Sequence, residues 1–428
     1  MKKFALAASA LLALNVSAAL ADDETPNFAE ETLSGDWGGL RSAAAQKGYV
    51  FTGGLKVDAL RSRGAIQRGT KAVSHLDLKL AVDLEKAAGW EGGSALINVL
   101  QNAGRGLNYE RDPYVGNLMG VTNIEVGAPT TTRLFQAWIQ QSLFDDQLAV
   151  LAGLYPIDSE FFAVDSAGVF LGPQYGTPAD LALTRGPSIF NSSAFGIRAR
   201  WNISKNFYAM GALLDGIPND PDQPKHTRIR FEDGDGSFQI GEIGWLPEAA
   251  NEEFKGHAKL AFGLWNYTAH EENLVDTAYA DTTGAFRMRS HRQHGGYLLG
   301  ERTLMRLSED GERYLTGFAR YTWGDARSYE LKNSLNLGVH VKGALAARPD
   351  DILGLAWTRA GTSSEFRQAT RIYGDSPTHS ESIWELTYRA QLTPYLAIQP
   401  NAQWVRNPGG TVGPNDAKLI GVRLDLTL

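Results

Sequence analysis

Two arginines, Arg198 and Arg200, have the residue type and spacing that most clearly suggest binding chemistry in this sequence. Side chains two positions apart point the same way from a β-strand, and each planar guanidinium group offers a rigid fork of hydrogen-bond donors to the oxygens of a polar solute. A neighbouring acid would hold such a fork in place and would accept hydrogen bonds from the same solute. Glu160 and Asp158 are the candidates for this acid, provided that their segment, PIDSEFF, folds inward. We therefore expect a solute-binding surface here.

Sequence motifs of enzymes and metalloproteins point elsewhere. The eight histidines show no H-E-x-x-H spacing, there is no G-x-S-x-G, and the absence of cysteine removes thiol catalysis and disulfides. The acidic segment 231–237, FEDGDGS, lacks the full calcium-loop pattern and favours an ordinary turn. We predict no catalytic residue, no metal and no cofactor. A membrane-embedded enzyme is the alternative, and it would need a nucleophile, a histidine and an acid on adjacent strands.

The elements that would position these side chains are strands of alternating polarity. Between residues 75 and 85, leucine or valine at every even position alternates with Asp77, Lys79 and other mostly charged residues. A helix would scatter these leucines around its circumference, so the pattern indicates a β-strand. About sixteen such segments occur, each near the ~9–11 residues of a tilted membrane-spanning strand. The predicted strands cover residues 49–59, 75–85, 94–101, 133–142, 147–155, 194–203, 206–215, 238–246, 256–268, 294–302, 314–323, 335–343, 351–359, 381–391, 395–405 and 417–428.

The strand pattern predicts an all-β fold, a transmembrane outer-membrane β-barrel of about 16 antiparallel strands over residues 49–428. Tight turns alternate loosely with long connections rich in Gly, Pro, Asn and Asp, as in barrels with short periplasmic turns and long outer loops. The last strand, 418–428, is amphipathic and suits closure against the first. The 10 Trp, 15 Tyr and 18 Phe would supply aromatic girdles. A soluble β-rich glycan-binding protein is the alternative that fractionation would exclude.

The first residues predict export. Lys2 and Lys3 precede a short apolar stretch, and Ala19-Leu20-Ala21 has the small residues that a signal peptidase reads, so we expect residues 1–21 to be a cleaved signal peptide. Residues 22–48 are expected to form a periplasmic segment with a short helix between Asp36 and Lys47. The net charge of −7 becomes −7 − 2 = −9 without Lys2 and Lys3, which disfavours a nucleic-acid partner.

Three segments resemble the carbohydrate-selective OprB porins. They are LSGDWGGLRSAAAQKGYVF near the start, AGLYPIDSEFF in the middle, and ESIWELTYRAQLTPYLAIQPNAQWVRNPGG followed by DAKLIGVRLDLTL near the end. Many outer-membrane barrels end in an aromatic residue, so Leu428 is a slight departure. The resemblance implies a sixteen-stranded barrel that passes monosaccharides such as glucose by passive diffusion. A general or anion-preferring diffusion porin is the alternative, favoured if Arg198 and Arg200 lack an opposing acid.

Strand alternation and loop position nominate the residues of the pore waist. Each charged residue nominated in this way has an alternative role, in which it belongs to a network of polar side chains that only fills the lumen side of the wall. Tyr155, Phe161 and Phe162 could offer stacking surfaces to a sugar ring or anchor a loop. The expected partners are small carbohydrates, outer-membrane lipid and the barrel assembly machinery, with monomer and homotrimer both open. The waist candidates are Arg198, Arg200, Arg185, Glu160, Asp158, Glu385, Arg389, Asp77 and Lys79. His340, Lys342, Arg423 and Asp425 are also expected on lumen faces.

Overall fold

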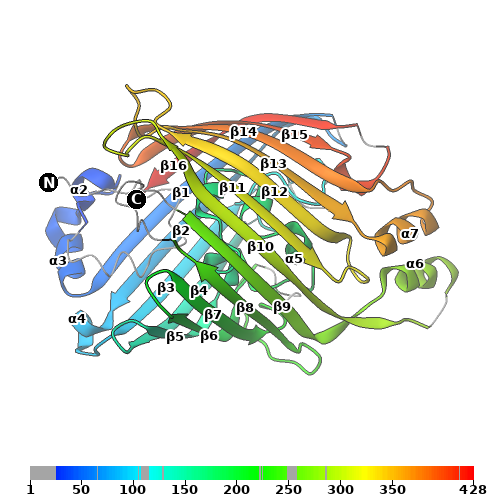
Figure 1. Ribbon diagram of the computed structural model, residues 1–428, viewed down its shortest axis with the longest axis horizontal. Coiled ribbons are helices and arrows are strands. Elements are labelled where there is room, and N and C mark those ends of the chain that lie inside the picture. Colours follow the sequence, from blue (N-terminus) through cyan, green and yellow to red (C-terminus); the bar gives the residue numbers. More distant parts are fainter. Residues whose placement is uncertain are drawn as a thin grey trace.

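The computed structural model shows a closed antiparallel barrel of sixteen strands, in which neighbours along the chain pair and β1 pairs with β16 (Figure 1). The structure describes residues 26–64, 66–104, 106–107, 115–127, 130–220, 223, 225–247, 258–284, 287–413 and 415–428, so the expected signal peptide, 1–21, lies outside them. Among these residues, no helix is long and apolar enough to cross a membrane. The strands are β1 Tyr49–Arg63, β2 Gly69–Asp83, β3 Gly93–Ala103, β4 Thr130–Leu143, β5 Leu148–Tyr155, β6 Ala194–Asn202, β7 Phe207–Asp215, β8 Ser237–Trp245, β9 Ala258–Glu272, β10 Ser290–Arg306, β11 Tyr314–Gly324, β12 Leu331–Lys342, β13 Ile352–Thr362, β14 Ser380–Thr393, β15 Leu396–Arg406 and β16 Ala417–Thr427.

Apolar and polar side chains alternate across the barrel wall as the sequence pattern predicts. In β2, Leu78 is 46% exposed on the outside, whereas Lys79 is 9% exposed towards the lumen. In β16, Ile420 is 60% exposed and Arg423 is 4% exposed. Apolar side chains that are exposed in a bare barrel are those that lipid covers in the membrane. The inside of the wall is therefore polar and the outside apolar.

The barrel closes where its last strand meets its first. The pairing of β1 with β16 runs without interruption from Gly54 opposite Thr427 to Arg63 opposite Lys418. Closure leaves no sheet edge whose backbone groups would need partners in lipid.

All sixteen predicted strands occur, and the differences lie at their ends. β2 starts at Gly69 and ends at Asp83, two residues before the predicted end, and residues Leu84–Ala88 form the short helix α4. The reason is local. The side chain of Asp83 accepts hydrogen bonds from the backbone N–H groups of Glu85 and Lys86, both at 3.0 Å, and so caps a helical turn.

The predicted N-terminal helix is present but starts later than expected. Between Asp36 and Lys47 the chain forms η1, Trp37–Gly39, and then α3, Leu40–Gln46; α2, Phe28–Glu31, precedes both. Gly38 and Gly39 have φ values of 69° and 93°, which interrupt the α-helical backbone. The Asp36 carboxylate still accepts from the third N–H group of α3, that of Ser42, at 2.8 Å.

Arg41 of α3 fastens this segment to the barrel. Its guanidinium Nη2 donates to the carbonyl oxygens of Phe51, at 2.7 Å, and Leu428, at 2.9 Å. Arg41 is 2% exposed. The two termini of the described chain therefore meet at one end of the barrel (Figure 1).

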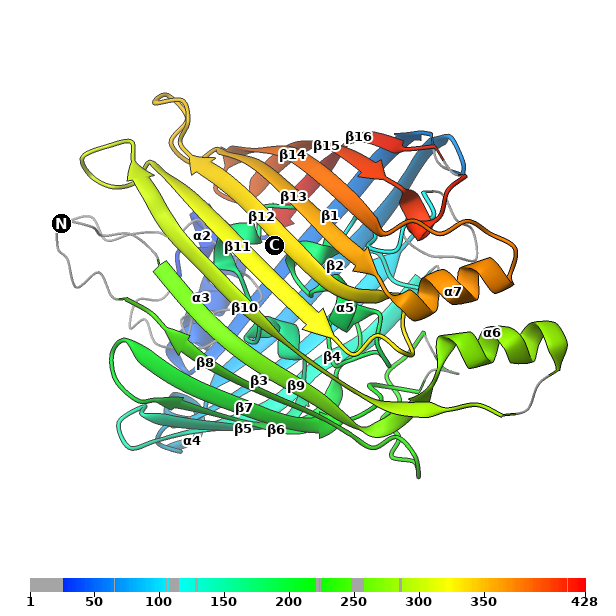
Figure 2. The ribbon, with the colours of Figure 1, turned by 45° about the vertical axis from the view of Figure 1, so that its right-hand side comes forward.

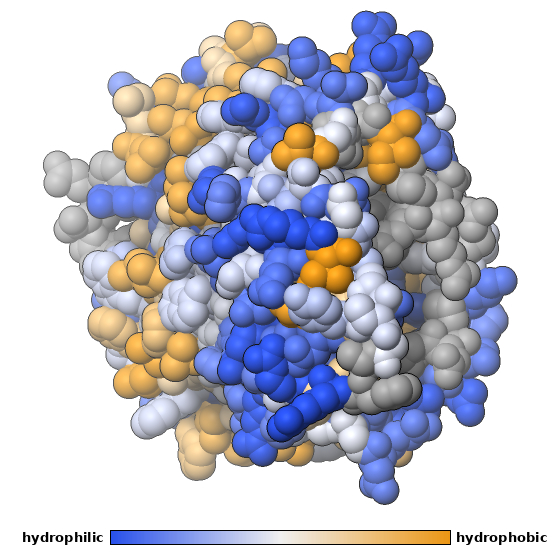
Figure 3. Space-filling model, turned by 90° about the vertical axis from the view of Figure 1, so that its right-hand side faces the viewer, coloured by the Kyte–Doolittle hydropathy of each residue, from blue (hydrophilic) through white to orange (hydrophobic). Residues whose placement is uncertain are grey.

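Short turns and long loops lie at opposite ends of the barrel. The end away from the termini carries α6, Leu274–Thr283, and α7, Ser364–Ile372, which lie side by side (Figures 1 and 2). This end is largely hydrophilic (Figure 3). We call it the loop end, and the opposite one the turn end. The hydrophilic loop end is the one that faces water outside the cell in barrels of this type.

Candidate functional site

The loop between β5 and β6, residues 156–193, folds into the barrel. It contains η2 Ile157–Ser159, η3 Asp165–Ala167, η4 Pro173–Tyr175 and α5 Ala179–Ala182, and α5 is visible inside the ring of strands (Figure 2). Residues 156–162, the PIDSEFF segment, therefore lie inside the barrel, as the prediction of Glu160 or Asp158 as the partner acid requires. We call this segment the inner loop. It narrows the lumen, so its attachments decide the shape of the passage.

Acids of the wall hold the backbone of the inner loop. Backbone N–H groups are obligatory donors, and an ionised carboxylate is a strong acceptor for them. Each of these glutamates is at most 4% exposed. The contacts are Phe162 N to Glu242 Oε2 at 2.9 Å, Ser166 N to Glu301 Oε2 at 2.8 Å and Leu171 N to Glu385 Oε1 at 2.6 Å.

Arg320 of β11 holds the carbonyl side of the same loop. Its Nη1 donates to the carbonyl oxygens of Phe162, at 2.8 Å, and Gly176, at 2.6 Å, and its Nη2 donates to that of Gln174, at 2.5 Å. Arg320 is 1% exposed. One guanidinium group thus joins three points that span fifteen residues of the loop, which a lysine could not do with a single point of charge.

The aromatic residues of the inner loop pack instead of lining a free surface. Phe162 lies edge-on to Tyr297, with ring centroids 5.8 Å apart, and Phe170 lies 6.0 Å from Phe318. Phe161 and Phe162 are both fully buried. They therefore anchor the loop, and neither offers a face to a passing solute.

The described part of the loop between β3 and β4 also enters the lumen. Glu381 of β14 accepts from the backbone N–H groups of Leu118, at 2.8 Å, and Met119, at 3.0 Å. Asn123 Nδ2 of the same loop donates to the carbonyl oxygen of Phe170, at 3.3 Å, in the inner loop. The two loops therefore meet and narrow the passage together.

The structure brings together Arg198 and Glu160 from the predicted group. Arg198 Nε lies 2.7 Å from Glu160 Oε2 and Arg198 Nη2 lies 2.8 Å from Glu160 Oε1, which makes a bidentate pair. Tyr155 donates its hydroxyl to the same carboxylate, and Gln140 Oε1 accepts from Arg198 Nη2 at 2.9 Å. Arg198 is only 3% exposed. Its donors are thus engaged by the protein, and the pair fastens the inner loop to β6.

Three other candidates lie apart from this pair. Arg200 stacks over the ring of Tyr208, at 4.3 Å, near the turn end of β6. Arg185 forms an ion pair with Glu271, at 3.0 Å, at the loop end of β9. Asp158 accepts from the backbone N–H of Phe190 at 2.9 Å, inside the inner loop itself.

The remaining candidates face the lumen, and several belong to one surface. Asp77 and Lys79 of β2 form an ion pair at 3.0 Å. Arg389 of β14 lies 3.5 Å from Asp425 of β16. The carboxylate of Glu385, in contrast, accepts hydrogen bonds from backbone N–H groups of the inner loop.

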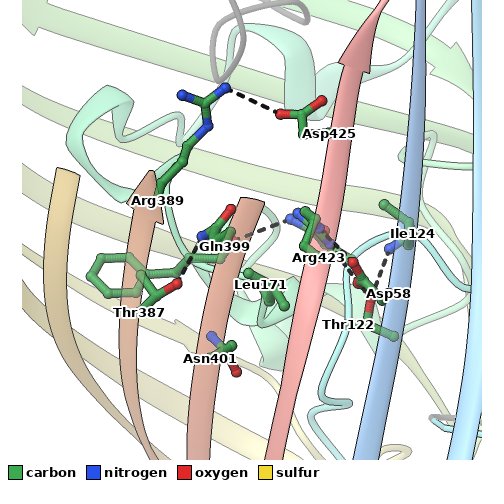
Figure 4. A network of polar contacts seen from close by, with 12 residues as sticks. Asp58, Thr122, Ile124, Leu171, Thr387, Arg389, Gln399, Asn401, Arg423 and Asp425 are labelled. Carbon is green, nitrogen blue, oxygen red and sulfur yellow. Dashed lines mark hydrogen bonds and ion pairs between the residues drawn. The ribbon is translucent and has the colours of Figure 1, made fainter. Parts of the chain in front are cut away.

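Asp425 and three further residues of this surface, Arg423, Asp58 and Lys56, are absent from the predicted waist. Arg423 of β16 forms a bidentate pair with Asp58 of β1, at 2.6 and 2.7 Å (Figure 4). Lys56 lies on the same strand as Asp58 and directly opposite Asp425. The alternation of side chains along a strand predicts that Arg423 and Asp425 face the lumen. Applied to residues 49–59, the same rule predicts that Lys56 and Asp58 face the lumen as well. We call the following seven residues the charged strip: Arg389, Asp425, Arg423, Lys56, Asp58, Asp77 and Lys79.

The comparisons with known proteins agree with this geometry. A family model described as "Carbohydrate-selective porin, OprB family" matches residues 67–428. Porin B of Pseudomonas aeruginosa is 26% identical over 446 aligned residues, which cover 98% of this chain and 95% of that protein. The putative porin QuiX of Acinetobacter baylyi is 22% identical and covers 92% of each.

Among solved structures, Pseudomonas putida OprB at high pH matches with a TM-score of 0.82, at 22% identity, over 94% of this chain and 100% of that one. The family match spans most of the barrel: it includes β2 to β16, and β1 precedes it. Together with the closed barrel and its polar, narrowed lumen, these matches identify the family of the chain. It belongs to the carbohydrate-selective OprB family of porins, and it is a bacterial outer-membrane channel for sugar-preferring passive diffusion.

Proposed function

We propose that monosaccharides such as glucose cross the waist of this channel along the charged strip. The strip lies on the lumen side of β14, β16, β1 and β2, and cations and anions are interspersed along it. Four cations and three anions give it a formal charge of 4 − 3 = +1. A sugar hydroxyl both donates and accepts hydrogen bonds. A surface of interleaved donors and acceptors therefore suits a neutral polyol better than it suits an ion.

Lys56 is the observation that carries this proposal. It is half-buried, and among the described residues no hydrogen-bond acceptor or acid pairs with its ammonium group. Asp425 and His75 lie directly opposite it on the two neighbouring strands, and Asp58 and Asp77 are among the nearby charges. A donor that the protein holds in place and leaves unbonded is the kind of group that replaces the water of a passing solute.

The other charged groups of the lumen are less available. The inner loop donates backbone hydrogen bonds to Glu242, Glu301 and Glu385, and Arg198 is paired with Glu160. Binding at the waist must be weak enough to release the solute. One free ammonium group with acids nearby offers weak and reversible contacts.

Glucose block of the ion current through single channels tests the proposal. The variant Lys56→Gln should lower the apparent glucose affinity, because it replaces a charged donor by a neutral one, and the matched control Lys342→Gln should not. Lys342 also faces the lumen, but it lies near the turn end, 3.8 Å from Asp350. Equal glucose block in the wild type and in Lys56→Gln would contradict the proposal.

An anion-preferring pore is the second candidate, and the net positive charge of the strip favours it. The reversal potential under a KCl gradient distinguishes the two. A strong anion preference together with no glucose block would favour the second candidate. A weak preference with glucose block would favour the first.

We infer that the chain acts as a channel without a catalytic centre. The support is the match to the porin family model over residues 67–428, together with the closed barrel and its polar, narrowed lumen. Assays with lipid and peptide substrates test this inference, and turnover of either would overturn it.

We also propose that the barrel assembly machinery recognises the amphipathic strand β16. Its outward residues, such as Ile420 and Val422, are exposed and apolar, while Arg423 faces inward. The variant Val422→Asp should lower the amount of folded barrel in the outer membrane, measured by the heat-modifiable shift on a gel. Unchanged assembly would contradict this proposal.

A further inference from the structure

Three cations on the outer wall form a patch at the loop end of the seam between β1 and β16. Arg61 and Arg63 point outward from β1 and are exposed, because the residues between and beside them, Leu60 and Ser62, are buried towards the lumen. Lys418 points outward from β16 and is also exposed. We call Arg61, Arg63 and Lys418 the outer basic patch.

The patch places like charges directly against each other. Arg63 is the cross-strand partner of Lys418, and Arg61 is only two residues from Arg63 on the same face. Like charges directly opposite across two strands destabilise a sheet. Among the described residues, no acid lies within ion-pairing distance of any of the three. The repulsion is therefore not relieved by the protein.

Asp416, two residues before Lys418 in the chain, already has other partners. Asp416 accepts from the indole Nε1 of Trp404, at 3.2 Å, and lies 3.8 Å from Arg406. It thus neutralises the cation of β15 and not those of β1 and β16.

The patch lies at the edge of the apolar band. Trp404, which faces outward, is the cross-strand partner of Lys418. Ile420, two residues along β16, is 60% exposed and is the partner of Arg61. Outward tryptophans mark the membrane interface in barrels, and long cationic side chains there extend their charge to the headgroup level. The three cations are therefore positioned at the height of the lipid headgroups.

We propose that the outer basic patch binds the phosphate group of a phosphorylated outer-leaflet lipid. Two guanidinium groups offer bidentate donors to phosphate oxygens, and an anion between Arg63 and Lys418 would convert their repulsion into attraction. The acyl chains of the same lipid would lie on the apolar residues below, beginning with Ile420 and Val422. The three cations thus match the phosphorylated headgroup of such a lipid, and the apolar residues below them match its acyl chains.

A lipid-binding titration tests the proposal on the full-length protein. The probe is bisphosphorylated lipid A added to the barrel in non-ionic detergent, with the bound lipid counted by native mass spectrometry. The test variant is Arg61→Gln/Arg63→Gln/Lys418→Gln. The matched control is Arg359→Gln/Lys332→Gln, which removes two exposed cations from the loop end of β13 and β12, where no such cluster occurs. The heat-modifiable gel shift and glucose block confirm that each variant folds.

The triple variant should bind lipid A roughly 100-fold more weakly, since each cation near an anionic lipid contributes a factor of about five. The control variant should bind like the wild type. Lipid A without its phosphates should bind like the triple variant, and excess inorganic phosphate should not displace lipid A, because it lacks the acyl chains. Equal binding by the triple variant and the wild type would overturn the proposal. The proposal would also be overturned if the wild type bound the phosphate-free lipid as tightly as lipid A, or if inorganic phosphate alone displaced lipid A. A wild-type dimer that dissociates in the triple variant would identify a second copy of the chain as the occupant of the patch and would likewise overturn the proposal.

Discussion

Replacing Arg320 should release part of the inner loop and widen the channel. Arg320 donates to the carbonyl oxygens of Phe162, Gln174 and Gly176, and it is 1% exposed. A hydrogen bond to a charged group contributes about 1.5 kcal/mol at the low end of the usual range, so three contribute about 4.5 kcal/mol. The low end applies because water in the lumen can take over some of the carbonyls. Since about 1.4 kcal/mol corresponds to a factor of ten, the released state should gain roughly a thousandfold in relative population.

Single-channel recording measures this effect. The variant Arg320→Gln should show a higher or more fluctuating conductance and a weaker glucose block than the wild type. Arg320→Lys keeps the charge but loses the fork, and it should lie between the two. The control Arg200→Gln removes a lumen-facing arginine that makes no contact with the inner loop backbone. A stable barrel in which Arg320→Gln leaves conductance, current noise and glucose block unchanged would refute the reasoning.

Three further predictions concern stability and charge. Arg423→Met breaks a buried bidentate pair with Asp58 and should destabilise the barrel by about 3–5 kcal/mol, seen as a lower midpoint of the heat-modifiable gel shift. Gly153→Ala should weaken the pairing of β4 and β5, because φ is 140° and an added Cβ would lie 2.2 Å from a backbone oxygen of β4; the same gel shift measures it. Hydrogen bonding from Arg289 lowers the pKa of Asp276 in the outer helix α6 to about 2. This lowering stabilises α6 above the ordinary pKa of about 4 and is lost as the pH falls towards 2, so Arg289→Ala should raise the pKa of Asp276, measured by carboxyl ¹³C NMR.

Each of these predictions has a control and a contrary result. For the ion pair, the double variant Arg423→Met/Asp58→Leu should recover much of the loss, and a double variant as unstable as the single one would contradict the argument. For the glycine, Gly241→Ala should be tolerated, because its added Cβ would meet only one atom, at 3.9 Å. An Asp276 pKa that is the same with and without Arg289 would contradict the assigned cause.

Strand positions could be predicted because alternation is a local property. The pattern of residues 75–85 needs no knowledge of the rest of the chain, and the outward placement of Leu78 and inward placement of Lys79 follow from it. The end of β2 could also have been predicted, since Asp83 before Leu-Glu-Lys is a helix-capping pattern.

The inner loop could not be predicted in the same way. Its position depends on contacts such as Leu171 with Glu385 and Arg320 with Gln174, whose partners lie 214 and 146 residues apart in sequence. Alternation shows that Glu385 and Arg198 face inward, but it does not show which inward charges are taken up by a loop and which are left for a solute. Lys56, in contrast, could have been predicted, because alternation applied to residues 49–59 places it on the lumen side together with Asp58.

The comparison of glucose with gluconate in liposome swelling tests the central claim most directly. The two solutes are similar in size and differ mainly in charge, so their relative rates separate recognition of a neutral sugar from attraction of an anion. A sugar-preferring waist predicts that glucose enters faster than gluconate, and that Lys56→Gln slows the entry of glucose whereas Lys342→Gln does not. A channel that admits gluconate readily and shows no preference for glucose would contradict the account.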